Sequence, residues 1–312
     1  MTTEPTQPAQ KPLINGLSAD TSLKQPSVKP SQGLHSTIAL DLRPMLEIWK
    51  NDVMPSILAR TGYPTYSIGL PSLDDVIWGL HKRELLCLGA RTSHGKSAFA
   101  TQIAMNIADK GCRVIYFSNE MSKEQLVERI FSNMMQVNNQ DLRRGMANDI
   151  VKQKDSTFQE MLKNWKLLID DKYSYDYKTM IKVCDVIRPD FIFIDYIQMV
   201  AVRGHRNKLE AIEENIRGLK QIANERNVGV VVVSQINRSG IDNMSMANLK
   251  GAGILEEHSD TVILVNYDWE KCKFQVRVDK QRHGICKSLE LKFEREFFRF
   301  CEQEIPANYG GV

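Results

Sequence analysis

The stretch from residue 84 to residue 110 constrains the fold most strongly. An apolar run, ELLCLGA, is followed by the polar loop ARTSHGKS and by a stretch with helical periodicity that ends near Lys110. A strand, a loop and a helix in this order, with the spacing GxxxxGK[ST], form the P-loop pattern. The first glycine of that pattern is Ala90 here, with Gly89 just before it. The sequence therefore predicts a phosphate-binding loop between a buried strand and a helix.

The residue types in this loop match the chemistry of a bound phosphate chain. Gly95 allows backbone N–H groups to surround a phosphate at a helix N-terminus, where the helix dipole favours negative charge. Lys96 is expected to reach the β- and γ-phosphates, and Ser97 to offer its hydroxyl to Mg²⁺. The residues expected to bind the phosphates are Ala90, Arg91, Thr92, Ser93, His94, Gly95, Lys96 and Ser97.

Further apolar runs indicate the fold class. RVIYFS, DFIFID and VGVVVVSQ are too continuous for half-exposed strands and are typical of buried parallel strands. Helical spacing recurs between them, over 95–110, over 123–135 and from Leu209 to Ile222. TVILVN, FQVRV and SLELKF predict more strands and hairpins near the end of the chain. We expect a doubly wound α/β domain with a mostly parallel, twisted sheet flanked by helices.

Three polar residues follow predicted strands. Asp195 ends FIFID, Glu120 follows RVIYFS, and Gln235 ends VVVVSQ. In a doubly wound sheet, ligands bind at the carboxyl ends of the strands. Asp195 is therefore expected to be a second Mg²⁺ ligand, Glu120 to orient an attacking water, and Gln235 to sense the γ-phosphate.

The N-terminal region differs in composition from the rest of the chain. Residues 1–37 contain five of the eleven prolines and few large apolar residues, so we expect a disordered arm. Residues 38–61 place apolar side chains at helical spacing, which predicts a short linker helix. Pro44 fits its first turn, whereas Pro55 is expected to kink or end it. The remaining residues, 62–312, would form the main domain.

Composition excludes several classes of protein. The 41 basic and 38 acidic residues give a net charge of +3, which alone does not indicate a nucleic-acid partner. The six cysteines include no CxxC pair, so we expect reduced thiols in the cytoplasm. No apolar run approaches the roughly 18 residues of a membrane helix, and no signal peptide is visible. Membrane, secreted and collagen-like proteins are excluded.

Several segments together resemble a known family. ARTSHGKSAFATQIA, YFSNEMSKEQLVERI, FIDYIQMV, SQINRS and DKQRHG occur in this order. They resemble the motor domain of DnaB-type replicative helicases, within the RecA-like ATPase superfamily, from about Tyr66 to Phe300. The resemblance implies a RecA-like P-loop core that uses ATP and Mg²⁺, as a ring-shaped homo-hexamer on single-stranded and forked duplex DNA. It also implies a primase, a helicase loader or a polymerase as partners, in a bacterial cytoplasm or a phage-infected host cell.

The resemblance assigns a role to each matching residue. Lys96 and Ser97 would bind the ATP phosphates and Mg²⁺ with Asp195, and Glu120, in the family's Ser-x-Glu-Met element, would be the catalytic base. Gln235 would couple the state of the γ-phosphate to the nucleic-acid loops. In KQR, Lys280 and Arg282 match a basic finger that reaches the ATP of a neighbouring subunit. A cation there stabilises charge that develops on the transferred phosphoryl group.

Two loops are expected to contact DNA. Residues 248–260 occupy the place of the family's nucleic-acid loop, with Lys-Gly-Ala-Gly where the helicases usually carry Arg-Glu-Ser-Gly. RGHRNK, residues 203–208, would form a second loop in the central channel. Phosphate contacts from such loops follow a strand without reading its bases. The residues expected to bind DNA are Arg203, Arg206, Lys208, Lys250, Gly251 and Gly253.

The match also leaves alternatives. Only about 65 residues precede it, so we expect the family's helical N-terminal domain to be absent. A RecA- or RadA-like recombination ATPase that forms filaments is one alternative, although the Ser-x-Glu-Met and KQR elements favour a helicase. An ATP-switched helicase-loading module is another, and Glu120 argues against it.

Overall fold

The computed structural model describes residues 43–59, 66–172, 175–200, 207–236 and 252–303. The chain divides into two compact units, residues 1–59 and residues 60–312. The arm expected over residues 1–37 lies outside the described residues. None of the helices in the described part of the chain combines the length and the apolar composition that a membrane span requires.

The first unit contains one helical run in three parts. These parts are α1 (Met45–Ile48), a π-helical turn (Trp49–Val53) and α2 (Met54–Leu58). Pro44 precedes the first turn, as expected, but the helix does not end at Pro55. Pro55 lies in the first turn of α2, where the missing N–H costs least, and the wider π turn precedes it. The irregularity therefore falls before the proline, and the helix continues for a further turn.

In the described part of the second unit, nine strands form one sheet in the order β3-β2-β4-β5-β1-β6-β7-β8-β9. The strands from β3 to β6 in this order are parallel, and β7, β8 and β9 are added antiparallel. This arrangement confirms the predicted mostly parallel α/β sheet. The strands are β1 (Leu85–Ala90), β2 (Arg113–Ser118), β3 (Lys166–Asp170), β4 (Phe191–Asp195), β5 (Gly229–Gln235), β6 (Thr261–Asp268), β7 (Lys273–Gln281), β8 (Ser288–Glu294) and β9 (Arg299–Glu302).

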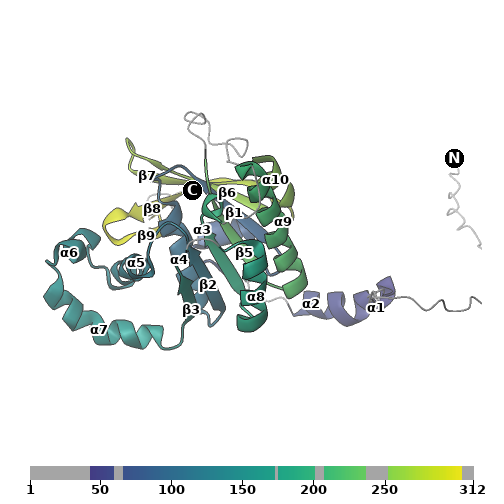
Figure 1. Ribbon diagram of the computed structural model, residues 1–312, viewed down its shortest axis with the longest axis horizontal. Coiled ribbons are helices and arrows are strands. Elements are labelled where there is room, and N and C mark those ends of the chain that lie inside the picture. Colours follow the sequence, from purple (N-terminus) through teal and green to yellow (C-terminus); the bar gives the residue numbers. More distant parts are fainter. Residues whose placement is uncertain (1–42, 60–65, 173–174, 201–206, 237–251, 304–312) are drawn as a thin grey trace, which may run out of the picture. The chain divides into compact units, whose positions relative to one another are not determined.

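Helices cover both faces of this sheet. Figure 1 shows α4 and α5 on one side and α8, α9 and α10 on the other. The helices are α3 (Pro71–Ile77), α4 (Lys96–Asp109), α5 (Lys123–Met135), α6 (Asn139–Arg144), α7 (Asn148–Leu162), α8 (Tyr177–Ile187), α9 (Lys208–Arg226) and α10 (Ala252–His258). Single 3₁₀ turns occur at Ile197–Met199 and Arg295–Phe297.

Alternation along β1 explains why its sequence is apolar at every position. Leu86 and Leu88 belong to the hydrophobic cluster that includes α4 and α5. Leu85 and Cys87 belong to the cluster that includes α8 and α9. Because successive side chains of a strand point to opposite faces, a sheet covered on both faces needs apolar residues throughout. The continuous runs of the sequence are the consequence of this two-sided burial.

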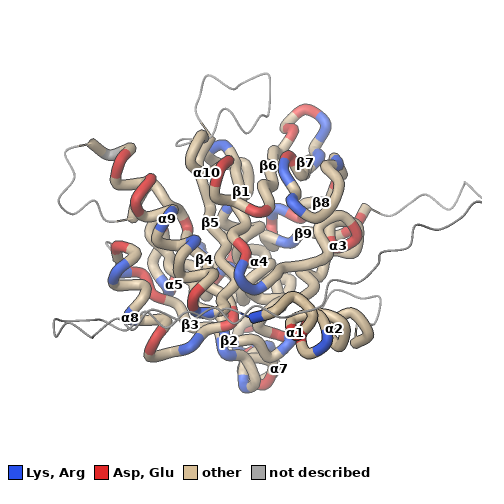
Figure 2. The backbone as a smooth tube through the Cα atoms, turned by 90° about the vertical axis from the view of Figure 1, so that its right-hand side faces the viewer, with Lys and Arg blue, Asp and Glu red and all other residues tan. Residues whose placement is uncertain are grey.

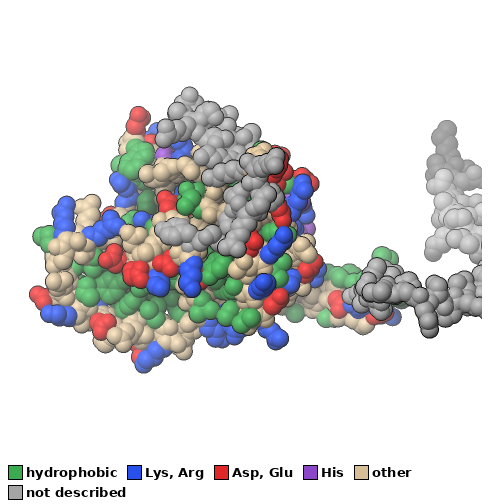
Figure 3. Space-filling view, viewed as in Figure 1, with side chains coloured by type: hydrophobic (Ala, Val, Ile, Leu, Met, Phe, Trp, Pro, Cys, Tyr) green, Lys and Arg blue, Asp and Glu red, His purple; other side chains and the backbone are tan. Residues whose placement is uncertain are grey.

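Charged residues are spread over the molecule. Among the described residues, Lys and Arg positions are distributed along the tube and do not gather in one segment (Figure 2). On the visible part of the face in Figure 3, basic and acidic side chains alternate across the surface. The described residues on that face therefore form no single dominant basic patch.

Candidate functional site

The loop between β1 and α4 forms an open helix N-terminus. Gly95 is the N-cap of α4, with φ of 82°, and no described side chain caps it. Its positive φ favours glycine, and a Cβ at this position would make a tight contact of 3.3 Å with the ring of Phe274. The first N–H groups of a helix have no partners within the helix. The start of α4 therefore offers backbone donors and a positive dipole to an anion.

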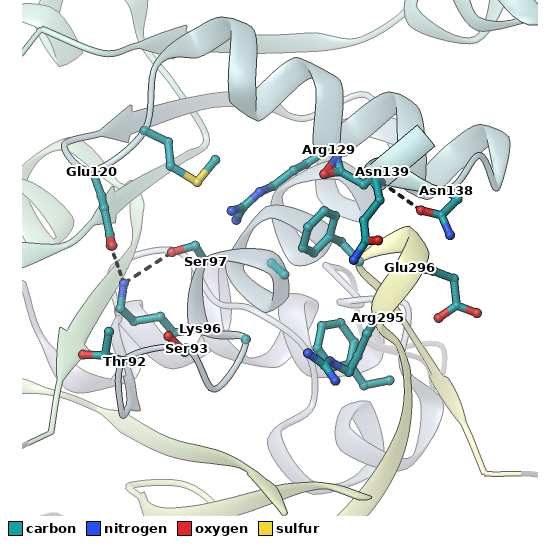
Figure 4. Close-up of a pocket in the computed structure, with 16 residues that line it drawn as sticks. Thr92, Ser93, Lys96, Ser97, Glu120, Arg129, Asn138, Asn139, Arg295 and Glu296 are labelled. Atoms are coloured by element: carbon teal, nitrogen blue, oxygen red, sulfur yellow. Dashed lines mark hydrogen bonds and ion pairs between the residues drawn. The ribbon is translucent and has the colours of Figure 1, made fainter. Parts of the chain in front are cut away.

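Lys96 lies at the centre of a polar cluster and is almost fully buried. Its Nζ lies 2.6 Å from Oε2 of Glu120 and 3.4 Å from Oγ of Ser97 (Figure 4). The same Nζ lies 3.9 Å from Oδ1 of Asp195. The same ammonium lies 4.7 Å from the centre of the Tyr196 ring. The structure thus brings together the predicted residues Lys96, Ser97, Glu120 and Asp195, which come from three separate segments of the sequence.

Asp195 is a buried acid with one oxygen already used. The β2–β4 register pairs it with Ser118, and the hydroxyl of Tyr116 donates to Oδ2 at 2.9 Å. Oδ1 has no hydrogen-bond partner among the described residues. Burial raises the pKa of Asp195, and this effect is opposed by the charge of Lys96, by the nearby hydroxyl of Ser97 and by the hydrogen bond from Tyr116.

The oxygens at this point fit a magnesium ion. Oδ1 of Asp195 is a buried oxygen that lacks a described partner, and the hydroxyl of Ser97 is close to the same carboxylate. Mg²⁺ prefers oxygen ligands, usually one or two carboxylates completed by water and substrate phosphates. Within the described residues, no group of three or more His, Cys, Asp or Glu side chains could hold an ion alone. The donor set therefore suits an ion that arrives with a phosphate substrate.

Gln235 contacts the phosphate loop directly. It pairs with Ala90 in the β1–β5 register, and its Nε2 donates to Oγ1 of Thr92 at 2.6 Å. Its backbone N–H donates to Oε1 of Gln198 at 3.3 Å. The side chain at the end of β5 is thereby positioned to respond to a change in the loop.

A cavity of about 650 Å³ extends from the phosphate loop towards α5, α6 and the segment 293–298. Arg129 on α5 and Arg295 line it together with Lys96 and Glu120 (Figure 4). The guanidinium of Arg129 lies 4.6 Å from the centre of the Phe298 ring, and burial lowers the pKa of Arg129. Arg129 was not predicted from the sequence. The available signal was an arginine next to the buried Ile130 on an amphipathic helix.

Not every residue of the predicted loop faces this cavity. Ala90, Arg91 and His94 are not among the described residues that line it. Nδ1 of His94 accepts a hydrogen bond from the backbone N–H of Tyr267 at 3.1 Å, so its ring is turned towards β6. Burial, and then the charge of Arg91, lower the pKa of His94. Its placement is that of a neutral side chain that supports the loop.

Lys280 and Arg282 lie far from the phosphate loop of their own chain. The backbone N–H of Arg282 donates to the carbonyl of Asp260, and the N–H of Asp260 donates to the carbonyl of Leu85. Arg282 is therefore level with the first residue of β1, whereas the loop follows its last residue, Ala90. Five steps along a parallel strand span about 17 Å. Within one chain, the predicted finger and the predicted ATP site are at opposite ends of the sheet.

The residues expected to bind DNA are largely outside the described structure. Arg203, Arg206, Lys250 and Gly251 lie outside the described residues. Lys208 begins α9, and Gly253 is an exposed residue of α10 with open space where a Cβ would be. The DNA-binding roles of these residues stay predictions.

Comparison with known families then decides which family the chain belongs to. The model of the DnaB-like helicase C-terminal domain matches residues 66–302. The chain belongs to this family. Membership implies that this DnaB-like domain binds a nucleotide.

Individual relatives show how much of the longer proteins this DnaB-like chain represents. A probable plasmid replicative DNA helicase of Chlamydia psittaci is 32% identical over 248 residues, covering 74% of this chain and 54% of the relative. Replicative DNA helicase DnaB of Geobacillus stearothermophilus is 31% identical over 262 residues, covering 78% and 57%. The chain thus spans about half the length of the curated relatives that it matches.

Two solved structures have a similar fold. One, described as the structure of a DnaB-like replicative helicase and its interactions with primase, has a TM-score of 0.74 and 26% identity and covers 81% of this chain and 67% of its own. The other, described as an ATPase domain, also has a TM-score of 0.74, with 25% identity, and covers 81% of this chain and 96% of its own. These matches confirm the predicted RecA-like architecture of the DnaB-like domain.

Proposed function

We propose that this chain is the motor of an ATP-dependent replicative DNA helicase. It would move along single-stranded DNA and unwind forked duplex DNA as a ring-shaped hexamer. The observation that carries the proposal is the separation of two half-sites: Lys96, Glu120 and Asp195 converge at one edge of the sheet, and Arg282 lies at the other. Two copies in a ring can join these halves. The family and the names of its members support the same activity.

The chain's own residues divide the work of ATP hydrolysis. The N-terminus of α4 and the ammonium of Lys96 bind the phosphates. Ser97 and Asp195 would hold Mg²⁺, which would supply positive charge to neutralise the phosphate oxygens. Glu120 is paired with Lys96 in this structure, and once Lys96 turns to the phosphates, the freed carboxylate accepts a proton from the attacking water. Arg129 adds a second cation to the cavity wall.

The remaining assignments concern control and movement. Gln235 links the phosphate loop to the residues that follow β5, and Lys280 and Arg282 supply cations to the neighbouring copy's phosphates. The six residues expected to bind DNA would hold the backbone of a single strand by charge and by main-chain donors. A primase, a helicase loader or a polymerase would be its partners in the cytoplasm of a bacterial or phage-infected cell.

Replacement of Glu120 tests this function. Glu120→Gln keeps the shape of the side chain but removes the base, so ATP turnover stimulated by single-stranded DNA should fall by about 100-fold or more while ATP binding persists. Strand displacement on a forked duplex should disappear with it. Glu128→Gln, an exposed position on the helix that follows Glu120, is the matched control and should behave like the unmodified protein.

Two results would contradict the proposal. One is an unmodified protein that neither hydrolyses ATP faster with single-stranded DNA nor separates a fork. The other is ATP binding without turnover in both variants, which would favour the helicase-loading module that uses ATP as a switch.

A further inference from the structure

Arg282 is attached to Asp260 at two points. Its Nη1 lies 3.1 Å from Oδ1 of Asp260, and its backbone N–H donates to the Asp260 carbonyl at 3.0 Å. The Asp260 side chain is 5% exposed, whereas the Arg282 side chain is 46% exposed. The guanidinium has five N–H donors in a fixed plane, so it can keep this contact and still present donors outwards. The buried acid thus holds the base of an exposed cation.

Asp260 is itself firmly anchored. Its Oδ2 accepts a hydrogen bond from the backbone N–H of Leu85 at 2.8 Å and contacts Nζ of Lys220 on α9. Its own backbone N–H donates to the carbonyl of Leu85 at 2.8 Å. The carboxylate is therefore fixed against β1 and balanced by two cations, which is the condition for keeping a buried charge in place.

The last turn of α10 contacts both cations of the predicted finger, Lys280 and Arg282. Nζ of Lys280 donates to the carbonyl of Glu256, and Nη2 of Arg282 lies 3.4 Å from the carbonyl of Glu257. Carbonyls at a helix C-terminus lack partners within the helix and carry partial negative charge. Asp260 follows this turn by two residues, so one short segment, 256–260, holds both side chains of the predicted finger.

From these contacts we propose that Asp260 is the positioning residue of the Lys280–Arg282 finger. The inference rests on the proposed function, in which Arg282 acts at the neighbouring copy's ATP. Asp260 fixes the guanidinium at the end of the sheet before assembly. The Arg282 side chain therefore loses little further conformational entropy when the two copies join. Misplacement of such a group by about 1 Å can reduce a rate by about 100-fold.

Asp260→Asn in the full chain is the first test. The amide keeps the size of the side chain and can still accept the Leu85 N–H, but it loses the charge that holds Arg282. We expect kcat of DNA-stimulated ATP hydrolysis to fall about 10- to 100-fold, with KM for ATP nearly unchanged because the phosphate loop is untouched. Asp185→Asn is the matched control, because it makes the same change at an acid that pairs with Arg226 and does not contact the finger. Its kcat should stay within about twofold of the unmodified value.

Mixed rings distinguish a misplaced finger from a damaged fold. Asp260→Asn subunits retain a complete phosphate loop, so mixing them with Lys96→Ala subunits, whose fingers are intact, should restore turnover. Mixing them with Arg282→Ala subunits should restore none, because both fingers are then defective. Full activity of Asp260→Asn alone, a raised KM with unchanged kcat, or no rescue by Lys96→Ala subunits would overturn the proposal.

Two further measurements keep the test decisive. A mixture of Lys96→Ala and Arg282→Ala subunits is the reference. If this mixture shows no rescue of ATP turnover, the shared site itself is wrong, and not only the role of Asp260. If Asp260→Asn does not fold, Arg282→Lys replaces it, because one ammonium cannot hold Asp260 and a neighbour's phosphate as a planar fork can. Arg282→Lys should lose a similar share of kcat, and a fully active variant would overturn the proposal.

Discussion

At the scale of single residues, one buried pair dominates the candidate site. The sequence predicted that Lys96 and Asp195 would lie close together, because a phosphate loop and a strand end meet at one edge of a parallel sheet. The structure places them 3.9 Å apart, with Glu120 even closer to Lys96. Their catalytic roles stay predictions, but the predicted neighbourhood is present.

Other residues of the site carry no such signal. Tyr116 lies inside the apolar run RVIYFS, where an aromatic residue reads as a core side chain, and it does belong to the core. Only the register between β2 and β4 brings its hydroxyl to Asp195. The ring of His94 contacts the backbone of β6, which its place in the loop pattern did not indicate, and its predicted role at a bound phosphate stays a prediction.

Tyr116→Phe tests the support of Asp195. The change removes a buried hydrogen bond to a charged group, which should lower the free energy of unfolding by about 2 kcal/mol. It should also raise the Mg²⁺ concentration needed for half-maximal ATP hydrolysis, because the carboxylate loses a donor that favours its charged form. Denaturant unfolding and a Mg²⁺ titration measure the two effects.

Tyr175→Phe is the control for this prediction. Its hydroxyl donates to Asp170 at 3.1 Å in a more exposed setting, so its loss should cost about 1 kcal/mol or less. Equal costs for the two variants, or an unchanged Mg²⁺ requirement in Tyr116→Phe, would show that the hydroxyl does not support Asp195.

At the scale of helices and strands, the sequence is most informative where burial is two-sided. The runs that became β1, β2, β4 and β5 were predicted because a strand covered on both faces is apolar throughout. The helix predicted over 123–135 matches α5, which begins after a capping box between Ser122 and Gln125. For this helix, the local capping signal and the pattern of buried residues predict the same element.

The helices and strand between residues 136 and 187 were not predicted from the sequence, and the structure gives a physical reason. β3 is an edge strand without a fully buried residue, so it lacks the apolar run of its neighbours. In α7 only Phe158 is buried, and a helix with so little burial has a weak apolar stripe. Elements held by few buried contacts leave little trace in a single sequence.

Asp190 links the segment before β1 to the start of β2 and makes the free energy of unfolding depend on pH. Its carboxylate accepts hydrogen bonds from Nζ of Lys82 and from the backbone N–H of Arg113 at the start of β2. Burial acts to raise the pKa of Asp190, but the bonds from Lys82 and Arg113 outweigh it and the pKa is lowered. A carboxyl with a lowered pKa stabilises the fold above its unfolded-state pKa, and this contribution is lost as pH falls through its folded-state pKa.

Asp190→Asn should therefore be less stable than the unmodified protein at neutral pH, and the difference should shrink as the solution becomes acidic. Urea unfolding at a series of pH values measures both. Asp185→Asn provides a more exposed acid in an ion pair with Arg226 for comparison. A stability difference for Asp190→Asn that stays constant down to acidic pH would show that the charge of Asp190 contributes nothing.

At the scale of the whole molecule, the proposed activity depends on the two ends of one sheet. The sequence contains both the phosphate loop and KQR but does not reveal their separation, because this depends on the antiparallel pairing of β7 with β6. That pairing returns the chain to the amino-terminal end of β1. Arg282 is thereby placed away from the phosphate loop of its own chain, as the proposed shared site requires.

The most direct measurement is ATP turnover per subunit in single-copy and assembled fractions. The fractions are separated by size and assayed at equal subunit concentration with single-stranded DNA. We predict turnover in the assembled fraction and almost none in the single-copy fraction, with Arg282→Ala reducing the assembled fraction to the single-copy value. Equal turnover in both fractions, unaffected by Arg282→Ala, would show that one chain completes its own site and would contradict a site shared between copies.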